Sequence, residues 1–389
     1  MEAYIVKGYR TAVAKSKKGG FKNYRSDDMA VDVIKYLVGQ VANLDPANVD
    51  DVIVGCANPE GEQGLQVGRL ISARALGIEV PGITINRYCA SGLEAIAIAV
   101  AKIKSGMGQI YIAGGTESMS LIPMTGYKLS PSYKANMENI NYHVSMGATA
   151  EAVAEKFNIS REAADTFSFK SHQKAANAID LGYFEDEIVP ITVEDVYVKD
   201  GKKVSNSHTV SVDEGVRRDT TIEGLSKLRA VFKQGGIITA GNASQTSDGA
   251  AFTLVMSEEK VKELGLEPQA RMAACSVGGV HPLYMGIGPC EAIPKALQQV
   301  GLQLSDIEQI ELNEAFAAQA LAVIQEAGLD PDTVNVNGGA IAMGHPLGCT
   351  GAKLTIQLLN EMQRRNQKYG MVTACVGGGQ GIAGIFERL

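Results

Sequence analysis

Short runs of apolar residues, many of them β-branched or aromatic, alternate along the chain with segments of helical periodicity. Six such runs predict strands, at residues 4–6, 52–54, 110–113, 252–256, 309–312 and 371–374. Residues 91–106 predict a helix that is apolar on nearly every side, and a helix of this kind has to be buried. The alternation indicates an α/β fold with mostly parallel strands.

Three of these elements have counterparts about 260 residues further along the chain. The pairs are 52–54 with 309–312, 91–106 with a helix that starts at Thr350, and 110–113 with 371–374. The constant spacing predicts one topology used twice, with the loops 86–91, 344–350 and 375–381 converging between the halves. Chance agreement between two ordinary α/β segments is the alternative.

Residues 118–249 break this rhythm, because they contain few alternating strands and much of the charge. Within them, residues 150–179 have helical character with Ser160 placed as an N-cap, and residues 193–215 form a hydrophilic, strand-like stretch. We predict an inserted domain that covers a site. A surface insertion without such a role is the alternative.

Composition narrows the function classes. The chain has 389 residues, enough for two or three domains, and 45 % apolar with 20 % charged residues is typical of a soluble globular protein. The net charge of −7 excludes a general positive field for nucleic acid, so an anionic substrate would need a local basic residue.

The cysteines and the N-terminus bear on the compartment. Six Cys residues without a C-x-x-C pair indicate free thiols. The first residues run into a strand-like segment with no apolar stretch long enough for a signal peptide, and no window approaches the roughly 18 apolar residues of a membrane span. We therefore expect a cytoplasmic protein without a membrane span.

Two residues stand directly before apolar helices. Cys89 lies in NRYCASG, where the helix N-terminus favours a thiolate and hence a nucleophile; a small buried hydrophobe is the alternative. His345 lies in GGAIAMGHPLGCTGA between Gly344 and Gly348, where an imidazole could act as a general base; a structural histidine in a turn is the alternative.

Two more candidates follow strands. Cys375 begins CVGGGQG, a loop whose backbone N–H groups suit an oxyanion, and Asn313 follows the strand at 309–312. The glycine cluster does not satisfy G-x-G-x-x-G, so a nicotinamide cofactor is not expected. His345 and Cys349 have the spacing of metal ligands but no second pair nearby, so we predict no metal site.

Taken together, the motifs resemble those of the thiolase family of acyl-CoA acetyltransferases. The resemblance covers the whole chain and keeps the family's order: RTAVAKSKKGG, NRYCASG, AGGTESMS, SMGATAEAVAEKF, LRAVFKQGGIITAGNASQTSDGAA, GIGP, ELNEAFAAQ, NGGAIAMGHPLGCTGA and CVGGGQG. It implies a duplicated βαβαβαββ core in αβαβα layers with an inserted loop domain. The predicted division is 1–117 plus 250–268 for the first core half, 118–249 for the inserted domain over the CoA site, and 269–389 for the second half.

The resemblance also implies roles. Cys89 resembles the thiol that takes the acyl group, His345 its base, and Cys375 the second thiol, which exchanges a proton with the α-carbon. Asn313 is similar to the residue that holds a water beside His345, and the backbone N–H groups of Cys89 and Gly377 resemble a second oxyanion site. Coenzyme A is then a substrate, and neither a metal nor a redox cofactor is needed.

For the CoA and acyl groups the resemblance implies a set of contacts from the inserted region and the second half. They are Arg217 at the adenosine phosphates, Phe232, Ala240 and Ser244 along the pantetheine, and Met285 and Phe316 at the wall of the pocket. Arg217 could equally be a surface charge, since Arg218 is adjacent, and Met285 and Phe316 could be plain core. A homodimer or dimer of dimers is implied, and a hydratase/dehydrogenase partner stays open.

The sequence departs from the family at Ser145, where members that prefer acetoacetyl-CoA carry His, and at Ser247, where Asn is usual. Ser145 and the GCTGA wording favour the degradative type: thiolysis of 3-ketoacyl-CoA in fatty-acid β-oxidation through acyl-Cys89. Biosynthetic condensation of two acetyl-CoA molecules is the alternative on the same residues. A non-catalytic acyl-CoA binding protein is a remote alternative, and a ketosynthase would need a second His where Asn313 stands.

Overall fold

The computed structural model describes residues 1–389 and contains one large mixed sheet. Its strands are β1 (Ala3–Thr11), β2 (Ala14–Lys15), β3 (Asp51–Gly55), β4 (Gly82–Ile85), β5 (Ile110–Ser118), β6 (Ile188–Val189), β9 (Ser247–Ser257), β10 (Ala270–Gly279), β11 (Gln309–Leu312), β12 (Tyr369–Val376) and β13 (Gln380–Arg388). They run in the order β11-β12-β13-β10-β1-β9-β5-β3-β4, while β2 pairs with β9 and β6 with β1.

The sheet repeats one topology, as the spacing of the sequence predicted. In the first half β1, β9, β5, β3 and β4 are neighbours in that order; in the second half β10, β13, β12 and β11 follow with the same relative directions. Beyond β11 a parallel bridge joins Ile310 to Val334, at the place that β4 occupies in the first half. The halves are joined in the sheet by the single pair Ile5 and Ala270.

The prediction of mostly parallel strands was wrong. Only β3–β4, β3–β5, β11–β12 and β1–β6 are parallel, and the other pairs are antiparallel. The reason is clear at the C-terminus, where β13 returns from β12 through the glycines 377–379. A connection this short can join only antiparallel strands.

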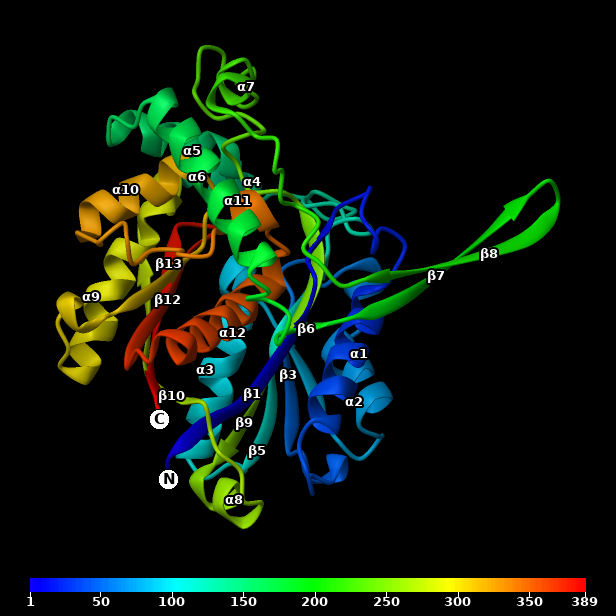
Figure 1. Cartoon of the computed structure of the whole chain (residues 1–389). Coiled ribbons are helices and arrows are strands. Elements are labelled where there is room, and N and C mark those ends of the chain that lie inside the picture. The colour runs from blue at the N-terminus through cyan, green and yellow to red at the C-terminus, as the bar shows by residue number, and fades with distance from the viewer.

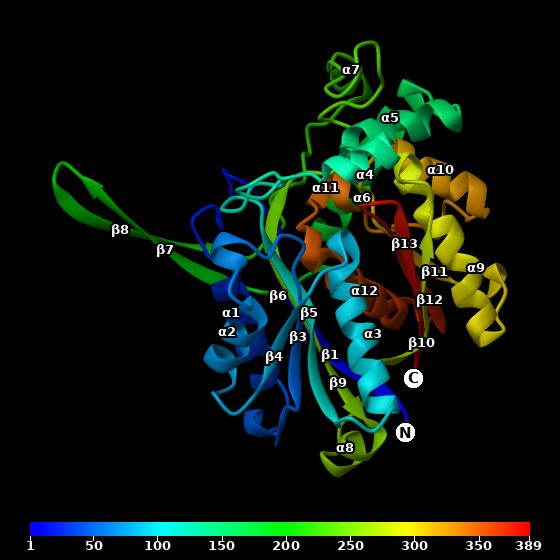
Figure 2. The same ribbon diagram turned by 180° about the vertical axis from the view of Figure 1, so that it is seen from behind.

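Helices complete five layers, which are seen edge-on in Figures 1 and 2. The main helices of the core are α1 (Ser26–Gly39), α2 (Val67–Ala75), α3 (Ser91–Lys104), α9 (Gly288–Val300), α10 (Ala317–Ala327) and α12 (Leu347–Arg365). Helices α1 and α2 cover the outer face of the first half, and α9 and α10 cover that of the second (Figure 1). Helices α3 and α12 lie between the halves and contact each other and strands of both halves of the sheet, which explains why α3 is apolar on most sides.

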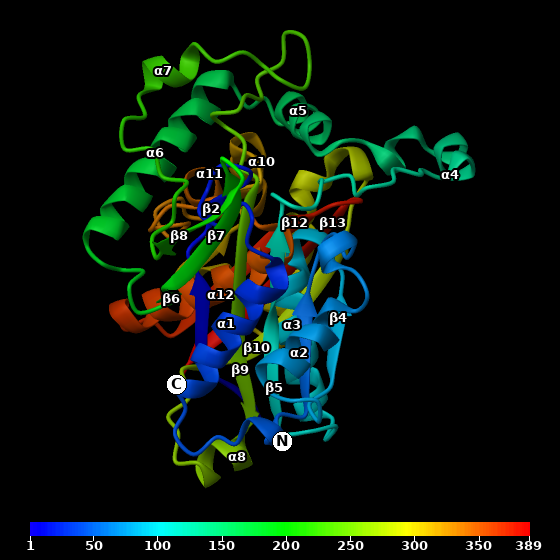
Figure 3. The same ribbon diagram turned by 90° about the vertical axis from the view of Figure 1, so that its right-hand side faces the viewer.

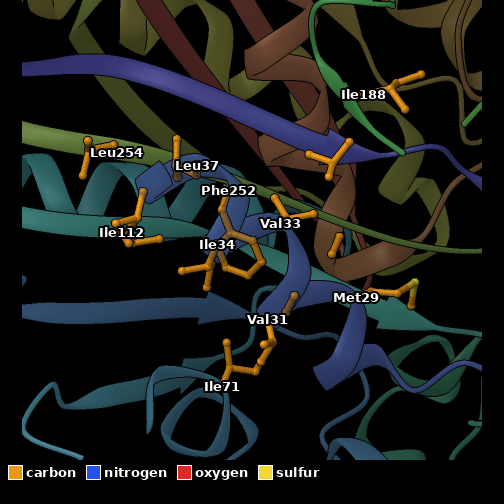
Figure 4. Packing of buried hydrophobic residues seen from close by; sticks show 14 of the residues in the cluster. Met29, Val31, Val33, Ile34, Leu37, Ile71, Ile112, Ile188, Phe252 and Leu254 are labelled. Atoms are coloured by element: carbon orange, nitrogen blue, oxygen red, sulfur yellow. The ribbon is translucent and has the colours of Figure 1, made fainter. Parts of the chain in front are cut away.

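The packing of α1 shows how an apolar stripe fixes a layer. Met29, Val33 and Leu37 recur every four residues and are buried, as is Ile34, and they face the strand residue Phe252 (Figure 4). Burial of one such side chain contributes roughly 1.5–3 kcal/mol. The stripe therefore holds α1 on β9 and β5.

The segment between β5 and β9 carries the remaining large elements. They are α4 (Tyr133–Glu138), α5 (Met146–Lys156), α6 (Arg161–Asp180), β7 (Ile191–Lys199), β8 (Lys202–Val210) and α7 (Ile222–Ser226). Helices α5, α6 and α7 lie over one end of the core (Figures 1 and 3), whereas the β7–β8 hairpin extends away from it (Figures 1 and 2). Ser160 caps α6 as predicted, since its hydroxyl accepts a hydrogen bond from Ala163 N–H at 3.1 Å.

Short helices complete the chain. They are α8 (Glu258–Glu263), α11 (Ala340–Met343), and the 3-10 turns η1 (Pro46–Asn48), η2 (Gly61–Gln63), η3 (Tyr88–Ala90), η4 (Ile140–His143), η5 (Pro282–Ile287) and η6 (Leu304–Asp306). No helix in the structure has both the length and the apolar character needed to cross a lipid bilayer.

Candidate active site

The starts of α3 and α12 cross at glycines. A Cβ on Gly92 of α3 would lie 2.6 Å from the backbone N of Ala352, and one on Gly351 of α12 would clash with the backbone N of Leu93 in α3. Only hydrogen fits at these two positions, so the helix ends approach more closely than other residues would allow. The crossing brings the two loops before these helices together, one carrying Cys89 and the other His345.

Cys89 lies in η3, directly before α3, and is only 8 % exposed. The backbone N–H groups of Cys89 and Gly377 are placed to donate hydrogen bonds to its sulfur. A negative charge on Cys89 would raise the pKa of Cys375 at the end of β12, so the two thiols are neighbours. Residues separated by almost 300 positions thus meet at one place. The predicted convergence of these loops is present in the structure.

The predicted thiolate is not supported. Burial is the main cause that raises the pKa of Cys89 to about 12, and the charge of Glu117 adds a smaller rise. The hydrogen bonds from the two backbone N–H groups lower this pKa but do not offset the burial. Burial likewise raises the pKa of the Cys375 thiol. Both thiols are therefore neutral at physiological pH, and a nucleophile at Cys89 needs a base to remove its proton.

His345 is buried and held from several sides. The Thr350 hydroxyl donates to the carbonyl of Pro346 at 2.9 Å, so at 2.6 Å from Nδ1 of His345 its oxygen accepts the Nδ1 hydrogen. The lone pair is then on Nε2, which faces Nδ2 of Asn313 at 3.3 Å. Burial, with the charge of Lys353, lowers the pKa of His345 to about 3, so the imidazole is neutral. This tautomer can accept a proton at Nε2.

Asn313 follows β11 and has an unsatisfied atom. Its Nδ2 contacts His345, while its Oδ1 is buried and has no hydrogen-bond partner in the protein. A buried carbonyl oxygen in this state can accept a hydrogen bond from a water or a substrate group. Asn313 and His345 therefore form one polar patch, as the sequence predicted for these two positions.

Four of the predicted substrate contacts gather over Cys375. Met285 and Phe316 share a buried cluster with Cys375, and the ring of Phe232 packs edge-on against Phe316 at 6.1 Å. Ser244 N–H donates to the carbonyl of Ala315 at 2.9 Å, directly before Phe316. Residues of the segment between β5 and β9 thus pack against the cluster that contains the second thiol.

The other two predicted contacts lie outside this cluster. Ala240 and Arg217 are both exposed. Arg218 is committed to a two-pronged ion pair with Asp180 at 2.7 Å, whereas the side chain of Arg217 has no ion-pair partner. The structure therefore separates the two adjacent arginines: Arg217 carries the free guanidinium.

Three residues near the site were not assigned a role from the sequence. They are Thr350, which orients His345; Ser247, whose hydroxyl donates to the carbonyl of Gln245 at 2.8 Å and accepts from His345 N–H at 3.2 Å; and Glu117, which accepts a hydrogen bond from Gly348 N–H at 2.9 Å. All three lie inside motifs visible in the sequence, but their contacts depend on how the two halves pack. No group of three or more His, Cys, Asp or Glu side chains is arranged to hold a metal ion.

Comparisons with known proteins agree with this geometry. Residues 3–259 match the family model for the thiolase N-terminal domain, and residues 266–388 match the model for the thiolase C-terminal domain. The chain is 52 % identical to the 3-ketoacyl-CoA thiolase of Bacillus subtilis (strain 168) over 388 residues, 99 % of each chain. It is 42 % identical to the 3-oxoadipyl-CoA/3-oxo-5,6-dehydrosuberyl-CoA thiolase of Escherichia coli (strain K12), with both chains covered in full.

A solved structure is similar as well. The crystal structure of the Bacillus anthracis acetyl-CoA acetyltransferase superposes with a TM-score of 0.88 at 39 % identity, covering 100 % of this chain and 99 % of that one. Family models over both halves, full-length relatives and the duplicated fold lead to the same conclusion. The chain belongs to the thiolase family and is an acyltransferase.

Proposed function

We propose that this protein cleaves 3-ketoacyl-CoA with CoA, in fatty-acid β-oxidation, to acetyl-CoA and an acyl-CoA shortened by that unit. The observation that carries the proposal is full-length identity of 52 % to a relative named 3-ketoacyl-CoA thiolase. Cys89 and Cys375 lie close to each other, and the start of α12, which follows the neutral His345, packs against the turn that holds Cys89. This supports the proposal, because the chemistry needs a nucleophile, a base and an acid that protonates carbon.

In the first half-reaction, His345 Nε2 takes the proton of the Cys89 thiol as the sulfur attacks the 3-keto carbon. The bond between C2 and C3 breaks, its electron pair stays on the acetyl-CoA enolate, and the Cys375 thiol protonates that carbon. In the second half-reaction the Cys375 thiolate takes the proton of the CoA thiol, whose sulfur attacks acyl-Cys89; the shortened acyl-CoA leaves, and the imidazolium of His345 returns its proton to the Cys89 sulfur. The acyl group leaves the first half-reaction as a thioester of Cys89, so it is still activated for attack by CoA.

Two polar sites suit the charges that develop. The N–H groups of Cys89 and Gly377 already act on the sulfur and can serve the tetrahedral intermediate, whereas Asn313 and His345 can hold a water that stabilises the enolate oxygen. One such donor contributes about 3 kcal/mol to the transition state.

For CoA we propose that the inserted residues 118–249 cover the site. Arg217 supplies the cation for the adenosine phosphates, and Phe232, Ala240 and Ser244 line the pantetheine. Two features support this assignment: Arg217 has no ion pair of its own, and Phe232 packs beside the active-site residue Phe316. The division into 1–117 with 250–268, 118–249 and 269–389, assembly as a homodimer or dimer of dimers, and cytoplasmic location stay predictions.

One experiment tests the mechanism directly. The protein is incubated with labelled acetyl-CoA, digested, and its peptides are mapped by mass spectrometry. We expect the label on Cys89 and none in the Cys89→Ala variant, whose thiolysis should fall by at least about a thousandfold. Absence of label on Cys89 in the native protein would support a non-catalytic acyl-CoA binding protein instead.

A biosynthetic role is the second candidate, favoured by the solved acetyl-CoA acetyltransferase of the same fold. Thiolysis of acetoacetyl-CoA is compared with that of 3-ketohexadecanoyl-CoA. A degradative enzyme of broad chain length should cleave both, while a strong preference for acetoacetyl-CoA would favour the biosynthetic role.

A further inference from the structure

Glu117 is a fully buried carboxylate at the end of β5, and only donors surround it. Its donors are Gln63 Nε2 at 2.6 Å, Ala57 N–H at 2.7 Å, Gly348 N–H at 2.9 Å, Asn58 N–H at 3.3 Å and the Cys56 thiol at 3.7 Å. A protonated carboxyl would need an acceptor for its own hydrogen. The Gln63 Oε1 atom is already occupied by Ser118 N–H at 2.6 Å, and although burial raises the pKa of Glu117, the N–H donors around it lower that pKa and favour the anion.

One branch of these contacts leads to His345. Gly348 is the second residue of α12, and Pro346 before this helix offers no side-chain cap. The carboxylate of Glu117 from the first half therefore caps a helix of the second half. A Cβ on Gly348 would lie 2.8 Å from Oε2 of Glu117, so the glycine permits this approach. The same first turn carries Thr350, which orients His345.

The other branch leads to Cys89. Ala57, whose N–H binds Glu117, receives a hydrogen bond on its carbonyl from Asn86 Nδ2 at 2.9 Å. The Oδ1 atom of Asn86 accepts from Tyr88 N–H at 2.8 Å, and Tyr88 is held at a φ of 44°, a left-handed conformation that is costly for a bulky residue. The residue before Cys89 is thus fixed in a strained turn by a chain of bonds that starts at Glu117.

The duplicated fold places Glu117 opposite a residue of the mechanism. Gly115 pairs with Gly55 at the end of β3, and Thr373 pairs with Leu312 at the end of β11. Glu117 lies two residues after Gly115 on β5, and Cys375 lies two residues after Thr373 on β12. The position that carries the second thiol in one half therefore carries a buried anion in the other.

We infer that Glu117 is a positioning residue: it locks the start of α12 to the loop before Cys89 and so sets the placement of His345 relative to the nucleophile, with a negative charge beside the thiol. The inference rests on the proposed function insofar as its test measures the rate of thiolysis. Around Cys89, the titratable groups are Glu117 at the end of β5, Cys375 on β12, Cys349 and Lys353 on α12, and His345 just before α12, together with Tyr88 and Arg87 of its own turn and Glu94 on α3, which forms an ion pair with Arg87. Among them, Glu117 is the anion that raises the pKa of Cys89.

The test replaces Glu117 by Gln, which keeps the size and removes the charge. We expect kcat for thiolysis to fall about a hundredfold with KM for CoA within about threefold, since displacement of catalytic groups by about 1 Å has this effect. The rate at which iodoacetamide alkylates Cys89 is measured by peptide mass mapping at a series of pH values. In Glu117→Gln the pH dependence of this rate should shift to lower pH, and the rate at pH 7 should be about threefold or more above that of the native protein. A kcat within about twofold of the native value, or an unchanged alkylation profile, would overturn the inference.

Matched variants separate position from charge and from folding. Asn86 is exposed, and the Asn86→Ala variant removes only the hydrogen bonds that lead to Cys89. We expect kcat to fall about tenfold, while the pH dependence of Cys89 alkylation stays unchanged. It carries the test if Glu117→Gln does not fold, and an unaltered kcat in Asn86→Ala then overturns the inference. Glu361→Gln removes another buried carboxylate, at the far end of α12, and should change neither readout. If the native protein does not cleave 3-ketoacyl-CoA, the proposed function fails, while the alkylation profiles still report on Glu117.

Discussion

The loops before α3 and α12 hold equivalent places in the two halves and are built in different ways. Cys89 and His345 each lie two residues before the first residue of their helix. In the first loop Asn86 and Tyr88, on the N-terminal side of the thiol, are exposed, whereas in the second every residue from Gly344 to Pro346 is buried. His345 has side-chain contacts to Thr350 and Asn313, and Cys89 has backbone donors alone.

The difference matches the work proposed for each residue. An acyl-CoA has to reach the sulfur from solvent, and the sulfur carries the acyl group afterwards, so its loop borders open space. A base has to keep one orientation and one tautomer, which a buried ring with two fixed partners achieves. Duplication supplied two glycine-lined helix starts, and different side chains at the same place gave complementary roles.

The largest expected effect comes from removing the side chain of His345, which is the more firmly held of the two residues. His345→Ala should lower kcat of thiolysis by about a thousandfold or more, because the Cys89 thiol, with a pKa of about 12, then has no base beside it. Steady-state thiolysis of acetoacetyl-CoA measures this. His143→Ala, an exposed histidine of the inserted segment, is the control and should retain activity. Comparable losses in both variants would mean that the buried ring has no special role.

The crossing of the helices can be broken without touching either partner. Gly351→Ala places a methyl group against the backbone N, Cα and Cβ of Leu93 in α3, so the two helix starts have to move apart. We expect a loss of about 1–3 kcal/mol in the free energy of unfolding, measured in urea, together with lower kcat. Gly39→Ala, where no atom lies within 4 Å of the added carbon, should leave both unchanged. Equal stability of the two variants would show that the helix starts tolerate separation.

Sequence reasoning went furthest where local pattern decides the structure. The repeated strand spacing predicted the duplication, and Cys89, His345, Cys375 and Asn313 were found because each stands beside an element end. The proportion of parallel strands and the charge state of Cys89 were predicted wrongly. The first depends on which strands become neighbours, and the second on how much of the loop is buried, and neither is a local property.

The missed contacts have the same origin. Glu117 reaches Gly348 across a separation of 231 positions, and Ser247 reaches His345 across 98. Both partners are backbone N–H groups, which carry no residue-specific signal. Only the packing of one half against the other shows that these side chains hold the site.

The pH dependence of the unfolding free energy tests whether His345, which like Cys89 is neutral in its loop, stays neutral in the folded protein. In the folded protein the pKa of His345 is about 3, against 6.5 for the free side chain, so the unfolded chain binds more protons as pH falls below 6.5. Stability is therefore present above pH 6.5 and lost toward pH 3, by up to about 1.4 kcal/mol per pH unit for one histidine. His345→Gln should reduce the slope of the unfolding free energy between pH 6.5 and 4.

A second buried histidine provides the reference for that slope. His172 in α6 has its pKa lowered to about 4, mainly by burial, and its contribution has the same sign. The slope that remains in His345→Gln should fall again in the double variant with His172→Gln. A slope that does not change when His345 is replaced would mean that this ring takes up a proton in the folded protein, and its loop would then be less closed than that of Cys89.

The smallest effect is expected from Ser247→Ala, which removes one of the bonds that hold the backbone of His345. The N–H of His345 keeps the carbonyl of Gln245 as an acceptor at 2.9 Å, so the loop loses a shared contact and gains no unpaired donor. We expect a loss of about 1 kcal/mol or less in the free energy of unfolding and less than about a threefold change in kcat. Urea unfolding and steady-state thiolysis measure both. A fall in kcat as large as that of His345→Ala would place the control of the imidazole in its backbone rather than in Thr350 and Asn313.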